Sequence, residues 1–453
     1  MSRRREGALV AALFLLAVAA AGLFWAVLPA EYRQNQSTDY LAHYEPVARA
    51  ILAGRGITDE AGQLATRYPP GFSLLLAGAW AVGGAAGLGD DVTLLALRLL
   101  CAGLAALLLY GLARLVWPAW AALAVGAVWA VYPFALWITK QPNSEVPFIP
   151  LFFATLLVFW LAVLRRPRVW PLYLLAGALA GAAMLVRPAA LGLGVVLAVL
   201  VVLPARPVRR PARLGLAALL LLGNALVVAP WLGAAYAATG KIIPLSSGGT
   251  VTLKDGLTFL VVEKEYRQDV PVAEDVAELM RAYQSRRAEM TSTGALLGVV
   301  LDEARREPLA FLKFTLIKAG RSWYGIDSRT FEGPTLAIQL LYLALILGGN
   351  GVAFFGRGAA TPRRDELRHM LAGNWLIVLT FWIMTMTAVP LLRYMLPLMG
   401  PLFIALPAVY YALRSRLVGR VANRATTNPI LTGRSRLLHG AIAAASVHLG
   451  HGR

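Results

Sequence analysis

The chain has 453 residues, of which 58% are hydrophobic and 15% charged. Soluble domains are about half apolar and about a quarter charged, so this composition excludes a soluble enzyme, a disordered chain and a coiled coil. The net charge of +19 is better explained by basic cytoplasmic loops of a membrane protein than by a nucleic-acid partner, and we expect no nucleic acid to bind.

Ten apolar segments predict membrane-spanning helices, because about 20 apolar residues cross roughly 30 Å of hydrocarbon. The first follows Arg3, Arg4 and Arg5. It is long for a signal peptide and lacks a small-residue cleavage site, so we expect it to be retained. The single cysteine, Cys101, excludes an intrachain disulfide framework and a thiolate metal cluster. The ten segments are residues 8–29, 92–112, 118–137, 147–164, 170–186, 189–204, 214–236, 334–355, 371–389 and 395–413.

Two further segments, residues 71–88 and 308–324, are ambiguous. Basic clusters in the regions 165–168, 206–213 and 357–368, and the basic tail, all fall on the side of Arg3 when neither segment crosses, as the positive-inside rule requires. A crossing by residues 71–88 alone would put the first three clusters outside. We therefore expect an interfacial or re-entrant helix at 71–88 and an amphipathic helix on the outer surface at 308–324.

The predicted fold is an all-α polytopic membrane protein of about ten transmembrane helices, with extracytoplasmic juxtamembrane helices and a small outer-loop subdomain. We expect it in the cell inner (plasma) membrane, with both termini cytoplasmic. The outer loop contains strand-like runs at 250–253 and 257–262 and helical charge spacing from 273 to 290. The expected divisions are a membrane core with the first and second outer loops (1–236), an extracytoplasmic loop with the amphipathic helix (237–333), C-terminal transmembrane helices (334–413) and a basic cytoplasmic tail (414–453).

Polar residues that could carry chemistry lie in the predicted outer loops. Asp39 precedes a helical stretch, where a helix N-cap is the structural alternative. Glu145 precedes an apolar span, where a favourable interaction with the helix dipole is the alternative. Arg393 lies in an outer link against the positive-inside trend, and the alternative is a side chain that extends to lipid phosphate. The sequence assigns no role to Arg98 or Arg187.

The order of short motifs along the chain resembles the glycosyltransferase-C superfamily. The motifs are Asp39-Tyr40, Gly54-Arg55-Gly56, Tyr68-Pro69-Pro70-Gly71, Ser144-Glu145, Arg187-Pro188, Pro230-Trp231 and Arg393-Tyr394-Met395-Leu396-Pro397. Within the superfamily the chain is most similar to the bacterial protein-mannosyltransferase-like branch, which includes the aminoarabinose transferase of lipid A. Protein mannosyltransferases proper have Asp-Glu where this chain has Asp39-Tyr40, a departure that favours the bacterial envelope branch.

The resemblance implies an inverting transfer of a hexosyl or pentosyl group from a polyprenyl-phosphate donor, on the extracytoplasmic face, to a lipid, glycan or protein acceptor. It implies that Asp39 acts as the general base or positions the acceptor. It implies that Glu145 joins Asp39 at a divalent metal (Mg or Mn) in some members, although this sequence does not require one. Arg393 is implied to lie near the lipid phosphate.

Elementary chemistry agrees with these roles. A departing polyprenyl phosphate develops negative charge, which a preorganised cation stabilises, and arginine binds phosphate bidentately. Arg393, Lys140 and Arg67 are the outer cations that we predict to bind substrate, together with Tyr68 and Tyr394. The attacking hydroxyl loses a proton, and Asp39 is the predicted base.

The sequence is also compatible with two other functions. A transporter or flippase of a lipid-linked saccharide would favour broken helices and polar groups near the bilayer midplane. The acidic residues instead gather in the predicted outer loops, which favours an enzyme. A structural subunit of an envelope assembly is the third alternative.

Overall fold

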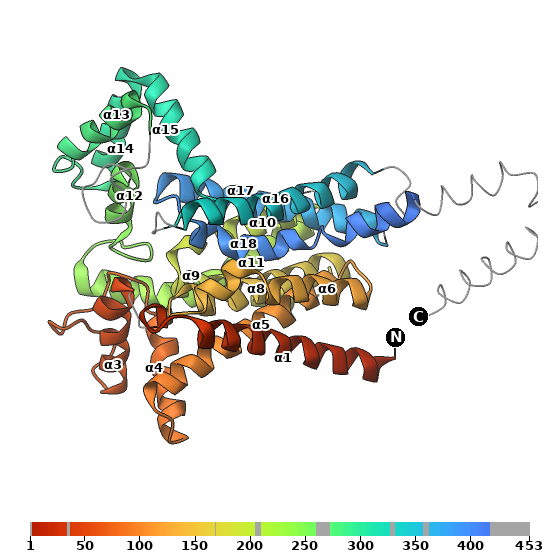
Figure 1. The fold of residues 1–453 in the computed structure, drawn as a ribbon. Coiled ribbons are helices and arrows are strands. Elements are labelled where there is room, and N and C mark those ends of the chain that lie inside the picture. The colour runs from red at the N-terminus through yellow and green to blue at the C-terminus, as the bar shows by residue number, and fades with distance from the viewer. Residues whose placement is uncertain are drawn as a thin grey trace, which may run out of the picture.

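The structure is a bundle of long helices with shorter helices gathered at one end (Figure 1). This computed structural model describes residues 2–33, 37–167, 169–203, 210–259, 272–326, 331–356 and 362–416. The described residues form helices and one isolated bridge, between Thr58 and Leu64, and contain no strand. The expected all-α polytopic membrane fold is confirmed. Most of the predicted basic tail lies outside the described residues.

Within the described ranges, seven helices are long and apolar enough to cross a membrane. Each coincides with a segment that the apolar runs predicted, because an apolar run of this length satisfies its backbone in lipid only as a helix. The seven are α1 (Arg3–Val27), α5 (Asp90–Arg114), α8 (Glu145–Arg165), α11 (Arg210–Thr239), α16 (Glu332–Phe355), α17 (Arg364–Thr387) and the segment Leu392–Arg416, which begins with α18 (Leu392–Phe403).

The remaining three predicted segments are shorter or interrupted helices. The segment at 118–137 divides into α6 (Ala119–Ala130) and α7 (Pro133–Ile138), because Tyr132 before the proline is extended. Next come α9 (Trp170–Val186), a 3₁₀ turn at Pro188–Ala190 and α10 (Leu193–Val202). Arg187 between α9 and the 3₁₀ turn is also extended and also precedes a proline. Both residues at these breaks are buried, with Tyr132 0% exposed and Arg187 7% exposed.

The two ambiguous segments form helices that are not among the seven long candidates. Residues 71–88 contain α4 (Gly71–Ala85), which lies with α3 (Glu45–Leu52) across the direction of the long helices (Figure 1). Residues 308–324 contain α15 (Pro308–Arg321), which lies at the same end of the bundle. This arrangement agrees with the prediction that neither segment crosses. The short helix α2 (Ala30–Arg33) and a π-helical turn (Tyr40–Tyr44) lead into α3.

Helices α12 (Gly249–Thr258), α13 (Glu274–Ser285), α14 (Thr293–Arg306) and α15 form a loop subdomain with its own apolar core. The predicted strand at 250–253 is wrong, since these residues are helical. The predicted strand at 257–262 begins in the same helix, and its end lies outside the described residues. Burial of Leu257 and Phe259 in the subdomain core outweighs the strand propensity of the threonines and valine.

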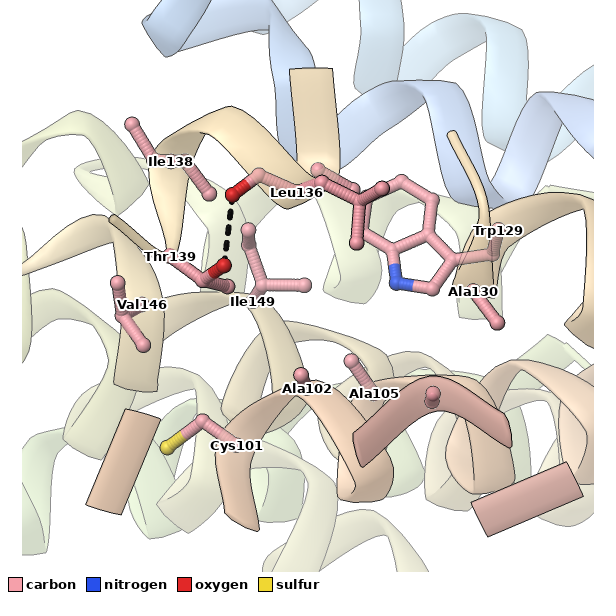
Figure 2. Close-up of a pocket in the computed structure, with 12 residues that line it drawn as sticks. Cys101, Ala102, Ala105, Trp129, Ala130, Leu136, Ile138, Thr139, Val146 and Ile149 are labelled. Atoms are coloured by element: carbon pink, nitrogen blue, oxygen red, sulfur yellow. Dashed lines mark hydrogen bonds between the residues drawn. The ribbon is translucent and has the colours of Figure 1, made fainter. Parts of the chain in front are cut away.

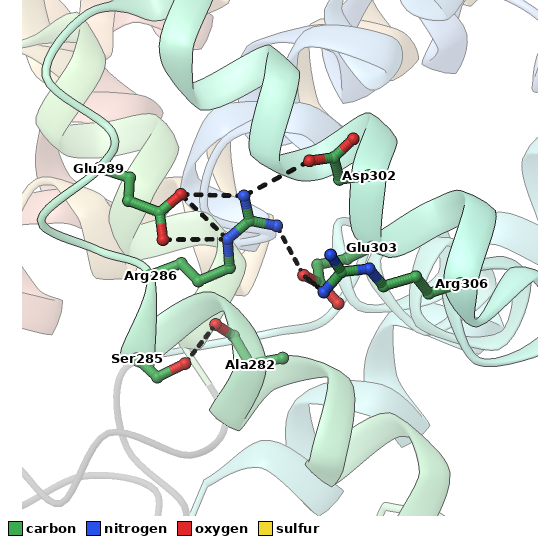
Figure 3. A network of polar contacts seen from close by, with 7 residues as sticks. All are labelled: Ala282, Ser285, Arg286, Glu289, Asp302, Glu303 and Arg306. Atoms are coloured by element: carbon green, nitrogen blue, oxygen red, sulfur yellow. Dashed lines mark hydrogen bonds and ion pairs between the residues drawn. The ribbon is translucent and has the colours of Figure 1, made fainter.

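Arg286 joins the end of α13 to α14 (Figure 3). Its guanidinium bonds Glu289 at 2.9 Å, Asp302 at 3.4 Å and the buried Glu303 at 2.7 Å. Arg306 also pairs with Glu303, at 3.3 Å. One arginine therefore holds three carboxylates and fixes how α13 and α14 meet.

Small residues let α9 and α11 pack closely in the bundle. A Cβ at Gly177 of α9 would lie 1.8 Å from the carbonyl oxygen of Leu220, and one at Gly223 of α11 would lie 2.1 Å from that of Leu174. Small residues are a common device for close helix packing in membranes, where apolar burial does not favour one helix over lipid. This packing supports the end of α9, where Arg187 lies.

Gly177→Ala should destabilise the protein, because the added methyl group collides with backbone that cannot move independently. Overpacking costs about 1–3 kcal/mol. Gly233→Ala on α11 is the matched control, because a Cβ there meets nothing within 4 Å, and alanine is the better helix former. Thermal unfolding in detergent should show a lower Tm for Gly177→Ala alone. An equal Tm for both variants would contradict the close contact.

Candidate functional site

A cavity lies at the end of the bundle where the short helices gather. It has a volume of about 270 Å³. Five segments contribute to its wall: the first predicted outer loop, the start of α8, the turn after α9, the end of α17 and the start of α12. Asp39, Tyr68, Glu145, Arg187, Arg393 and Tyr394 are among the lining residues. Segments far apart in the sequence therefore meet at one cavity.

Asp39 forms one wall of the cavity and does not cap a helix. It precedes the π-helical turn, but its side chain makes no capping hydrogen bond. The Tyr68 hydroxyl instead donates to Asp39 Oδ1 at 2.7 Å. Burial, and then the hydrogen bond to Asp39, raise the pKa of Tyr68, so Tyr68 stays a donor and orients the carboxylate.

Ring stacking and a close backbone contact place Tyr68. Its ring stacks on Tyr44, with centroids 4.9 Å apart. The prolines that follow it lead into α4 at Gly71, where a Cβ would lie 2.6 Å from the carbonyl carbon and oxygen of Leu185. Glycine at this position therefore lets α4 begin against the end of α9, and brings the first loop close to Arg187.

Across the cavity, Glu145, Arg187 and Arg393 form a cluster that we call the Arg–Glu cluster. Glu145 is 4% exposed and Arg187 is 7% exposed. Arg187 Nη1 lies 2.7 Å from Glu145 Oε2, and Arg393 Nε lies 3.8 Å from Glu145 Oε1. Arg187 also donates to Ser144 Oγ at 3.1 Å. Among the described residues, two guanidinium groups therefore face one buried carboxylate.

Tyr394 completes the Arg–Glu cluster. The guanidinium carbon of Arg187 lies 5.0 Å from the centre of the Tyr394 ring, and that of Arg393 lies 5.2 Å from it. Arg393 Nη2 donates to the Tyr394 hydroxyl at 3.3 Å. Cation–π contacts of this kind hold a guanidinium in place without neutralising its charge.

The loop subdomain holds the segment before Arg393. Lys318 Nζ of α15 donates to the carbonyl of Gly256 at 2.7 Å and to that of Thr387 at 3.4 Å. The backbone N–H of Leu392 donates to the carbonyl of Gly325 at 2.7 Å. Burial lowers the pKa of Lys318 to about 7. The position of Arg393 therefore depends on contacts with a different part of the chain.

A second buried arginine, Arg98 of α5, supports the loop that leads to Glu145. It donates to the carbonyls of Thr139, at 3.2 Å, and of Lys140. These carbonyls lie at the end of α7 and lack helical partners. Arg98 therefore anchors the start of the segment that ends at Glu145.

Five of the seven residues predicted for the site line the cavity: Asp39, Tyr68, Glu145, Arg393 and Tyr394. The other two do not. Lys140 lies over the ring of Trp137, with Nζ 4.0 Å from the ring centre. Arg67 lies against Gly248, whose Cβ would be 3.4 Å from Arg67 Nε.

Sequence reasoning left Arg187 without a role, although it is the most closely paired cation of the site. The available signal was an arginine between two apolar segments, which requires a carboxylate partner when buried. That partner, Glu145, is 42 residues away in the sequence. Composition alone could not connect the two.

The geometry does not suit a metal held by Asp39 and Glu145. Both Glu145 oxygens face guanidinium groups, and one Asp39 oxygen accepts a hydrogen bond from Tyr68. Within the described ranges, no group of three or more His, Cys, Asp or Glu side chains is placed to hold a metal ion. Asp39 and Glu145 are therefore not arranged as a shared metal site.

A second hollow, of about 20 Å³, lies between α1, α5 and the segment from α6 to α8 (Figure 2). Apolar side chains such as Trp129 and Ile149 line it, and no charged residue does. The Thr139 hydroxyl donates to the carbonyl of Leu136 at 2.6 Å. This hollow is too small for a substrate.

Comparisons with known proteins support the resemblance. Residues 68–233 match the family model described as dolichyl-phosphate-mannose-protein mannosyltransferase. No curated protein sequence matches the chain.

Solved structures share the fold at low sequence identity. The crystal structure of the Archaeoglobus fulgidus oligosaccharyltransferase in the apo form has a TM-score of 0.54 and 13% identity, over 93% of this chain and 52% of that chain. The oligosaccharyltransferase AglB of the same organism, in complex with an inhibitory peptide and a dolichol-phosphate, has a TM-score of 0.50 and 15% identity, over 92% and 52%. The complex with Zn and sulfate has a TM-score of 0.52 and 14% identity, over 92% and 51%.

The chain spans about half the length of these solved structures. The family match covers the end of the first predicted outer loop, Glu145 and Arg187. These findings support the predicted resemblance: residues 68–233 match the family model, and the chain shares its fold with these oligosaccharyltransferase structures.

Proposed function

We propose that the chain is an inverting membrane glycosyltransferase. It moves a sugar from a polyprenyl-phosphate donor to a hydroxyl of an envelope acceptor, on the extracytoplasmic face. One observation carries the proposal: Asp39 and the Arg–Glu cluster line the same cavity. A base and a phosphate-binding cation are the two groups that this transfer needs.

The Arg–Glu cluster is suited to bind the donor phosphate. Its two guanidinium groups attract an anion, and an arginine can donate two parallel hydrogen bonds to phosphate oxygens. Because Glu145 holds Arg187 at 2.7 Å, that guanidinium is already oriented before the donor arrives. Preorganised charge of this kind stabilises a transition state without the cost of rearranging water.

The cavity also has an apolar wall that fits a prenyl chain. Pro188, Ala189 and Leu191 line it from the turn before α10, and Phe381 and Met384 line it from α17. Leu191 is 43% exposed, so this wall continues to the outer surface of the bundle. A donor phosphate at Arg187 would place its lipid chain along these apolar side chains.

Asp39 is the proposed base. The acceptor oxygen attacks the anomeric carbon while the bond from that carbon to the phosphate oxygen breaks. The acceptor proton passes to Asp39, and the electron pair of the broken bond leaves with the polyprenyl phosphate. Tyr68 occupies Oδ1 of Asp39, which leaves Oδ2 for the acceptor. Ser246 and Thr252 of the opposite wall offer hydroxyl groups that can orient the acceptor.

Asp39→Asn should abolish transfer, because an amide cannot take the acceptor proton. General bases contribute about 10²- to 10⁴-fold to rate. Mass spectrometry of envelope glycans and lipid-linked intermediates, in cells with each variant, measures the effect. Asp59→Asn is the control, because Asp59 is an exposed carboxylate of the same loop.

Full activity of Asp39→Asn would remove Asp39 from the mechanism. A liposome experiment identifies the alternative function. If the purified protein moves a lipid-linked saccharide across the bilayer without forming a glycosidic product, it is a flippase.

Chelation should leave transfer intact, because the guanidinium groups face the Glu145 oxygens that a metal would need. The measurement compares product formation by purified protein with and without EDTA. Loss of activity in EDTA, restored by added Mg²⁺ or Mn²⁺, would contradict the arginine-based mechanism. It would leave Asp39 as the base.

A further inference from the structure

Three arginine side chains gather at the end of the bundle opposite the cavity. Helix α8 begins with Glu145 at the cavity and ends with Arg165, and its 21 residues span about 30 Å. Arg114 is the last residue of α5, and Arg363 immediately precedes α17. The three arginines therefore lie one membrane thickness away from the proposed active site.

The carbonyl of Leu115 brings two of these arginines together. Arg363 Nη1 donates to this oxygen at 3.0 Å, and Arg165 Nη2 donates to the same oxygen. Arg114 directly precedes Leu115 in the chain. It donates to the carbonyl of Trp117 at 3.3 Å. Like charges are held close together here by the backbone at the end of α5.

In the part of the chain that the structure describes, two carboxylates pair with these three arginines. Arg165 pairs with Glu366 at 2.9 Å, and Arg114 pairs with Glu6 at 3.0 Å. Among the described residues, three guanidinium groups therefore share two carboxylates. The pKa of Arg363 is lowered, first by burial and then by repulsion from Arg165. An anion bound at this position would relieve the repulsion.

The backbone of Arg363 is also strained. Its φ of 50° makes it the one non-glycine residue with a positive φ in the part of the chain that the structure describes. A side chain other than Asn or Asp is unfavourable in this region. Backbone strain of this kind persists where surrounding contacts hold the residue in place, and it clusters at functional sites.

We propose that Arg114, Arg165 and Arg363 form a binding site for the phosphate of an anionic phospholipid. The site lies at the ends of three membrane-spanning helices, at the level of the lipid headgroups of the leaflet opposite the cavity. Guanidinium groups bind phosphate oxygens in parallel pairs of hydrogen bonds. The lipid would connect the ends of α5, α8 and α17.

Native mass spectrometry of the full chain in neutral detergent tests the site. Phosphatidylglycerol, phosphatidylcholine and inorganic phosphate are added separately, and bound copies are counted. We expect saturable binding of phosphatidylglycerol, little of phosphatidylcholine, and no displacement of the lipid by inorganic phosphate at equal concentration. Arg363→Asn removes the charge while keeping a residue that tolerates this backbone. It should weaken phosphatidylglycerol binding about tenfold.

Arg4→Gln is the matched control, because Arg4 is an exposed arginine at the start of α1, near the same end. It should change binding less than twofold. An equal loss in both variants would show attraction to overall charge and overturn the site. Equal binding of the two lipids by the unmodified chain would also overturn it, and this comparison needs no variant to fold. Displacement of phosphatidylglycerol by inorganic phosphate would show that the site binds a free anion, and would overturn the phospholipid proposal.

Discussion

The structure of the cavity depends on one buried carboxylate shared by two arginines. Removing a charge from water costs several kcal/mol, so a buried ion persists only with close partners. Glu145 has Arg187 at 2.7 Å and Arg393 at 3.8 Å. Because these residues come from the start of α8, the end of α9 and the start of α18, the ion pairs require those three helix ends to meet.

This requirement explains why the helices break where they do. Arg187 is extended between α9 and a proline, which ends the helix and turns the guanidinium toward Glu145. Two prolines precede α4 and fix Tyr68 beside Asp39. Lys318 and the N–H of Leu392 hold the segment that carries Arg393. Each charged residue of the cavity is therefore positioned by a neighbouring element and not by its own helix alone.

Much of the fold could be predicted because length and apolarity determine which segments cross a membrane. The prediction that the segments at 71–88 and 308–324 do not cross rests on charge, since one added crossing changes the side of every later basic cluster. The strand at 250–253 was mispredicted because its propensity is weak, whereas packing of Leu257 and Phe259 in the loop subdomain depends on partners distant in sequence.

Part of the site could also be predicted, because charged residues beside apolar spans are visible in the sequence. Asp39, Glu145 and Arg393 stood out as charges beside apolar spans. The pairing of Glu145 with Arg187 depends on how α8 packs against α9, and a single sequence carries no record of that contact. The same limit explains Lys140, which is close to Glu145 in the chain but packs on Trp137.

The most direct test of this account is a double-mutant cycle on Glu145 and Arg187, read out as the affinity of purified protein for a polyprenyl phosphate. Arg187→Gln should weaken binding about tenfold or more, because hydrogen bonds to a charged phosphate are lost. Glu145→Gln and Arg187→Gln together should show a coupling of about 1 kcal/mol or more, as expected for residues in contact. Unchanged affinity in Arg187→Gln, or strictly additive effects, would contradict the claim that this ion pair forms the phosphate-binding element.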